Sequence, residues 1–109
     1  MKDNTVYLKH IIDAIVTIEE YSNGFDYDSF LENRLVQDAI IRQFMIIGEA
    51  SKNLTKDFKE KYPDIPWKQI TGMRDKVVHG YFEVDLDAIW TTIEEDLIIL
   101  KEKLNSIQL

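Results

Sequence analysis

The chain has 109 residues, of which 45% are hydrophobic and 30% charged, and its formal net charge is −7. This size and composition predict a single folded domain over residues 1–109 and argue against a disordered chain. The absence of cysteine excludes disulfides, thiolate catalysis and thiolate metal sites. The acidic charge argues mildly against general nucleic-acid binding, because neutralising phosphates requires Lys and Arg.

The sequence also predicts the cellular location of the protein. The first residues lack the basic start and apolar run of a signal peptide, and apolar stretches such as Met45-Ile46-Ile47 are too short to cross a bilayer. We therefore expect a cytoplasmic protein with no membrane partner. Residues 50–79 hold seven Lys or Arg against four Asp or Glu, whereas the rest holds six against sixteen. This basic segment is either an ordinary solvated face or a basic approach to the residues that follow it.

The first predicted helix covers residues 5–22. Apolar residues recur there at spacings of three and four, from Tyr7 through Ile11 to Tyr21, which forms one stripe. Leu8, among others, widens that stripe, so we expect burial on more than one side. Asn23-Gly24 should end the helix, because both residues tolerate the left-handed conformation.

The second predicted helix runs from Ser29 to about Asn53, after a connection at residues 25–28. Ser29 and Glu32 have the spacing of a capping box. Residues 39–47 are apolar around most of the circumference, which indicates either the central helix of the domain or a helix with one face against a second subunit. Gly48 costs about 1 kcal/mol relative to Ala inside a helix, so we expect another helix to approach closely there.

A polar, mostly helical continuation is predicted over residues 52–62, ended by Pro63-Asp64-Ile65-Pro66. The third predicted helix runs from Pro66 to about His79, with Trp67 anchoring its start and Gly80 terminating it. We therefore expect His79 in the last turn, where the negative end of the helix dipole favours a protonated imidazole.

The last predicted helix begins at Asp85, a plausible N-cap, and its apolar residues alternate by three and four as far as Ile107. The sequence has no internal repeat and no strand pattern longer than a few residues. The predicted fold class is therefore all-α, an up-and-down antiparallel bundle of four principal helices.

Chemically reactive side chains are densest in residues 73–82. Arg74 offers a permanently charged planar fork of donors, and His79 can move protons near neutral pH. Asp75 and His79 are four apart, so we expect them to touch on one helix face. Arg74 and His79 are five apart, or about 140° around a regular helix, so aiming both at one small group needs a frayed helix end or a two-fold dimer. Tyr81 follows just beyond.

These residue types suit metal-free cleavage of an RNA phosphodiester, in which a histidine moves protons and an arginine stabilises charge on phosphorus. The spacing alone leaves an ordinary alternative open, in which Arg74 pairs with a surface carboxylate and His79 caps a helix. For the other candidates we expect ordinary roles. His10 should be a helix-face residue, Trp67 and Trp90 packing anchors, and Glu94-Glu95-Asp96 a solvated face without a metal.

The pattern Arg74-x4-His79-x-Tyr81 resembles the signature of the HepT-like family of HEPN domains. The residues on both sides, Ile65 to Met73 and Phe82 to Asp85 with Trp90, are also similar to that family, as is Gly48-Glu49-Ala50. The resemblance therefore covers essentially the whole chain. It implies an all-helical HEPN-like homodimer with paired motifs in a cleft between the subunits.

The resemblance also implies a function. It suggests a metal-independent endoribonuclease that needs no cofactor and acts as the toxin of a type VII-like HepT/MntA toxin–antitoxin pair. The implied partners are RNA and an MntA-type nucleotidyltransferase antitoxin, which attaches AMP to the motif tyrosine. By position, Arg74 and His79 would be catalytic, Asp75 would support them and Tyr81 would be modified. The alternative is a non-catalytic helical module that dimerises and binds a nucleotidyltransferase.

Overall fold

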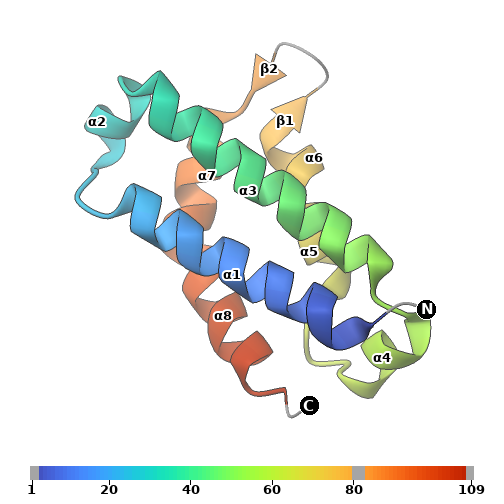
Figure 1. Cartoon of the computed structure of the whole chain (residues 1–109). Coiled ribbons are helices and arrows are strands. Elements are labelled where there is room, and N and C mark those ends of the chain that lie inside the picture. The colour runs from blue at the N-terminus through green and yellow to red at the C-terminus, as the bar shows by residue number, and fades with distance from the viewer. Residues whose placement is uncertain (1–2, 80–82, 108–109) are drawn as a thin grey trace.

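The computed structural model describes residues 3–79 and 83–107 and confirms the all-α, HEPN-like prediction. Figure 1 shows two long helices side by side in front of two shorter helical rods. The front pair is α1 (Asn4–Ser22) and α3 (Arg34–Asn53). Behind α3 lie α5 (Trp67–Thr71) and α6 (Met73–Val77), and behind α1 lies the rod made by α7 (Leu86–Thr91), the π-helical turn η1 (Thr92–Asp96) and α8 (Leu97–Asn105).

The first helix agrees with its prediction to within one residue at its start. Asp3 caps α1 by accepting a hydrogen bond from the Thr5 backbone N–H, and Leu8 and Ile11 are buried on the inner face. Gly24, one residue beyond the C-cap, has a φ of +85°, which an L side chain rarely adopts. The predicted stop at Asn23-Gly24 is therefore confirmed.

The predicted start of the second helix was wrong. A short helix, α2 (Tyr27–Leu31), comes first, and its N-cap is Asp26 rather than Ser29. The Asp26 carboxylate accepts from the Ser29 N–H at 2.8 Å, and the Ser29 hydroxyl accepts from the Asp26 N–H at 3.0 Å. Ser29 is therefore the N3 residue of a reciprocal capping box whose N-cap is Asp26. The main helix α3 then starts afresh, because Asn33 caps it by accepting from the Val36 N–H.

The segment after α3 contains a separate helix instead of a continuation. Leu54 is extended and ends α3, and Thr55 caps α4 (Lys56–Lys61) by accepting from the Phe58 N–H. Leu54 and Phe58 are both buried. Phe58 stacks at a tilt on Trp67, whose indole N–H donates to the backbone carbonyls of Lys59 and Tyr62 at the end of α4. Trp67 is therefore the packing anchor that was predicted.

The third helix ends earlier than predicted. Gly72 separates α5 from α6, and α6 ends at Val77. The β-branched Val78 adopts an extended conformation, and β1 (Val78–His79) pairs antiparallel with β2 (Glu83–Val84), placing His79 opposite Glu83. His79 therefore lies on a strand, and its predicted position in the last turn of a helix was wrong.

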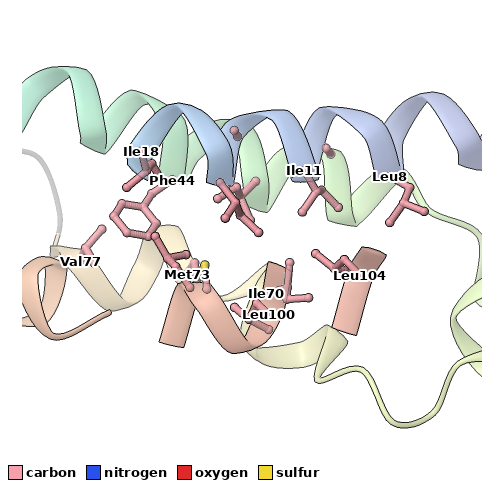
Figure 2. Packing of buried hydrophobic residues seen from close by; sticks show 14 of the residues in the cluster. Leu8, Ile11, Ile18, Phe44, Ile70, Met73, Val77, Leu100 and Leu104 are labelled. Atoms are coloured by element: carbon pink, nitrogen blue, oxygen red, sulfur yellow. The ribbon is translucent and has the colours of Figure 1, made fainter. Parts of the chain in front are cut away.

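One hydrophobic core fills the space between the front helices and the two rods. Figure 2 shows Ile18 and Phe44 meeting Val77 and Met73 from the α6 side, while Leu8 lies near Leu104. Phe44 and Val77 are 0% exposed and Met73 is 5% exposed. The helix that carries Arg74 is therefore fixed to the core by the residues on either side of it in sequence.

None of the helices in the described ranges is both long enough and apolar enough to cross a lipid bilayer.

Candidate active site

The position of Arg74 depends on a close approach of α6 and α5 to α3. Gly48 is buried on α3, and a Cβ atom added there would lie 3.3 Å from the Thr71 carbonyl oxygen and 3.6 Å from the Arg74 Cβ. One turn further along α3, the buried Ser51 hydroxyl forms a 2.7 Å hydrogen bond with the Thr71 hydroxyl. The close approach predicted at Gly48 is confirmed, and it is what sets Arg74 against the main helix.

The Arg74 guanidinium is half-exposed. Its side chain has 41% of its surface accessible, and its Nη1 atom lies 3.1 Å from Oδ1 of the neighbouring Asp75, which is 79% exposed. An ion pair this open to solvent contributes little energy and is easily exchanged for another anion. Arg74 is thus held by its backbone and Cβ, while its charged end is accessible to solvent and pairs with Asp75.

His79 follows α6 directly and is also half-exposed, at 52% of its side-chain surface. Its Nε2 atom lies 3.8 Å from Oδ2 of Asp85. The expected contact between Asp75 and His79 was wrong, because the helix ends at Val77 and the four-residue helical spacing no longer applies. Asp75 instead pairs with Arg74.

An open, shallow hollow surrounds His79. It is lined by the imidazole, by apolar side chains and by three carboxylates: Leu31, His79, Glu83, Val84, Asp85, Leu86 and Asp87. A second hollow shares Val84 and Leu86 with the first and extends it along the first turns of α3. This end of the molecule therefore combines the histidine, a run of negative charge and exposed apolar side chains.

Asp87 in this hollow is already engaged. The Tyr27 hydroxyl of α2 donates a hydrogen bond to the Asp87 carboxylate on α7. This bond, followed by burial, raises the pKa of Tyr27 above its ordinary value, because the neutral phenol is the form that donates. The two residues are sixty positions apart, and no sequence pattern indicated that they would meet.

Tyr81, the predicted modification site, lies outside the described residues, and so do Gly80 and Phe82. The remaining candidates have the ordinary roles expected of them. His10 is exposed and meets Tyr7 edge-to-face at 6.2 Å between ring centroids. Trp90 packs on the buried Phe30. Of the acidic run, Glu94 and Glu95 are exposed, while Asp96 pairs with Lys76 at 3.4 Å.

Metal binding finds no support in the part of the chain that the structure describes. No group of three or more His, Asp or Glu side chains converges there in a way that could hold an ion. The charged groups of the described site are Arg74, His79 and their carboxylate neighbours Asp75 and Asp85.

Comparison with known proteins gives a consistent family. The sequence pattern described as "Ribonuclease HepT-like" matches residues 11–107. A Thermococcus cleftensis protein named "Probable ribonuclease HepT" is 44% identical over 102 residues, covering 94% of this chain and 93% of that protein. A Caldanaerobacter subterraneus protein named "Putative RNase" is 39% identical over 107 residues, covering 98% and 96% respectively.

A longer relative is similar as well. A Methanocaldococcus jannaschii protein named "Gamma-glutamylcyclotransferase and putative RNase" is 46% identical over 103 residues, which are 94% of this chain. Those residues make up 46% of that protein, so the chain spans about half the length of this relative. No solved structure matches the chain.

Proposed function

The chain belongs to the HepT-like ribonuclease family, and from this membership we propose that it cleaves RNA without a metal ion, using Arg74 and His79. The observation that carries the proposal is the placement of these two side chains. Both are half-exposed on adjoining elements, α6 and β1, and the core fixes the backbone of α6 beneath them. An accessible guanidinium can stabilise charge on phosphorus and an accessible imidazole can transfer protons, and phosphodiester transfer uses both contributions.

The proposed reaction needs only groups of this kind. The 2′-hydroxyl of the RNA attacks the adjacent phosphorus and gives its proton to an imidazole, forming the P–O2′ bond. An imidazolium gives a proton to the 5′-oxygen as the P–O5′ bond breaks, which leaves a 2′,3′-cyclic phosphate and a 5′-hydroxyl. Arg74 stabilises the additional negative charge that builds up on the phosphorane oxygens.

We propose that two copies of the chain build the site. Each copy supplies one His79, so a dimer supplies both the base and the acid. Exposed apolar side chains at the end of α2, at the start of α3 and on β2 suit such an interface: Leu31, Leu35 and Val84 are 37%, 81% and 39% exposed, respectively. Leu31 and Val84 line the hollow of His79 itself. We call these three residues the α2–β2 patch. A second Arg74 brought across this surface would also offset the carboxylates around His79.

Leu35→Glu tests the dimer. A charge at this 81% exposed position should leave the monomer folded but prevent burial of the patch. We expect sedimentation to report a monomer and RNA cleavage to be lost. The matched control is Ile98→Glu on α8, 51% exposed and outside the patch, which should keep both the dimer and the activity. A fully active monomeric Leu35→Glu protein would refute the shared site.

His79→Ala tests the catalytic assignment. Loss of an acid–base group typically costs about 10²–10⁴ in rate, and we expect cleavage and growth inhibition to disappear while helicity is retained. The control is His10→Ala, which removes the other histidine of the chain from an exposed helix face. Likewise, Arg74→Ala should inactivate the protein, whereas Arg42→Ala, which removes another exposed arginine, should not.

We further propose that the protein is a cytoplasmic toxin, neutralised when an MntA-type nucleotidyltransferase attaches AMP to Tyr81. Phosphates added close to Arg74 in sequence would compete with the substrate for its charge. The test is the intact mass of the protein after co-expression with the nucleotidyltransferase. Mass increments equal to AMP should appear, and they should be absent from Tyr81→Phe but present in Tyr27→Phe.

A non-catalytic module that binds a nucleotidyltransferase remains the second candidate. The net charge of −7 and the three carboxylates around His79 favour it, because both repel RNA. The two functions differ in a simple way. Purified protein that binds the nucleotidyltransferase but cleaves no RNA, with His79→Ala behaving identically, would establish the module and reject the ribonuclease.

A further inference from the structure

Asp85 has two carboxylate oxygens with two different neighbours. Oδ1 accepts a hydrogen bond from the Ala88 backbone N–H at 2.9 Å and so caps α7. Oδ2 lies 3.8 Å from Nε2 of His79. The capping role was predictable from the sequence, but the second neighbour was not, because it depends on the pairing of β1 with β2.

The backbone holds Asp85 in this position. Its N–H donates to the Val77 carbonyl at 2.7 Å. This bond is next to the strand pair, because Val77 precedes Val78 and Asp85 follows its partner Val84. The strand pair and the bond to the end of α6 hold the backbone of Asp85, and the cap of α7 holds its carboxylate. The strand pair and the cap therefore keep the Asp85 carboxylate close to the backbone of His79.

The other charged groups around His79 are placed differently. Glu83 is paired with His79 in the strand register, and Asp87 lines the same hollow but accepts the Tyr27 hydroxyl bond. Asp75 pairs with Arg74. Within the described ranges, Asp85 is the one carboxylate within 4.0 Å of the imidazole.

We propose that Asp85 is the positioning residue of His79, holding the Nε2 side of the imidazole so that Nδ1 faces the RNA. The proposal rests on the ribonuclease function argued above and deepens it. A carboxylate at Nε2 orients the ring and stabilises the protonated form, which is the form that donates to the leaving 5′-oxygen. Asp75, the support expected from the sequence, would then act only on Arg74.

Asp85→Asn is the variant that separates these roles. Asparagine caps a helix about as well as aspartate, so the bond to Ala88 and the fold should survive while the charge beside His79 is lost. Asp75→Asn is the matched control, because it removes one negative charge from the same segment without touching the His79 contact.

The measurement is the NMR titration of the two histidines, with His10 as the internal reference. We expect Asp85→Asn to shift the midpoint of His79 to lower pH, with no shift for His10, and Asp75→Asn to leave both midpoints in place. A shift of His79 in Asp75→Asn, or none in Asp85→Asn, would overturn the proposal.

Activity then supplies a second and separate readout. If His79 is the acid, the alkaline limb of the kcat profile should move to lower pH in Asp85→Asn, by the same interval as the NMR midpoint. An NMR shift without any RNA cleavage by wild-type protein would reject the ribonuclease function and, with it, the role of Asp85 in positioning a catalytic histidine. Active wild-type protein with an unmoved profile in Asp85→Asn would reject only the positioning role.

Discussion

Gly48→Leu tests whether the contact of α3 with α5 and α6 determines both stability and the position of Arg74. A Cβ atom alone would lie 3.3 Å from the Thr71 carbonyl oxygen, a backbone atom that can move only with its helix. In Gly48→Ala, the gain of about 1 kcal/mol in helix propensity and a crowding cost of similar size should nearly cancel.

Leucine adds three more carbon atoms at the same contact. Overpacking of this kind costs about 1–3 kcal/mol, and we expect Gly48→Leu to lower the free energy of unfolding by about 2 kcal/mol. In a domain of this size, that corresponds to a fall in Tm of roughly 10 °C. Since α6 would be pushed away from α3, RNA cleavage should fall more than tenfold even where the protein is fully folded.

The assay pairs urea unfolding with initial cleavage rates at 25 °C. The control is Glu49→Leu, which adds the same side chain at the next position of α3, where the native side chain is 72% exposed. It should change stability by less than about 0.5 kcal/mol and leave cleavage intact. If Gly48→Leu were as stable and as active as wild type, the close packing of α5 and α6 on α3 would be refuted.

Three further substitutions test the fold. Hydrogen bonds from the Ser29 N–H and hydroxyl lower the pKa of Asp26. The ionised Asp26 cap therefore stabilises the protein at pH values above the unfolded-state pKa of Asp26, and this stabilisation is lost on acidification. In urea unfolding, the stability advantage of wild type over Asp26→Asn should shrink between pH 7 and pH 3. Thr92→Val should raise stability by about 1 kcal/mol in thermal unfolding, because the buried Thr92 hydroxyl has no partner in the described chain. Trp67→Phe should lower stability by about 1–3 kcal/mol on the same assay, since two backbone carbonyls lose the indole donor.

The elements predicted correctly are those set by local patterns. Three-and-four spacing located α1 and most of α3, and a cap followed by apolar residues located the start of α7 at Asp85. Gly48 was correctly interpreted as a close approach, because glycine inside an apolar helix is otherwise costly.

The predictions failed where the sequence allowed two competing local structures, or where a residue distant in the sequence determined the structure. Asp26 and Ser29 are both good capping residues three positions apart, and the structure uses Asp26 as the cap. The residues after Val77 could continue the helix or extend, and the pairing of Val78 with Val84 selects the extended form. Because the chain extends there, the carboxylate near His79 is Asp85 and not the predicted Asp75.

The central claim is that the protein cleaves RNA through its own side chains. The most direct measurement is digestion of an end-labelled RNA in the presence of EDTA, with mass analysis of the product ends. We predict full activity in EDTA, 2′,3′-cyclic phosphate ends, and no cleavage where the attacking 2′-hydroxyl is replaced by hydrogen. Cleavage that stops in EDTA and returns with magnesium, or that proceeds at a 2′-deoxy position, would contradict the account.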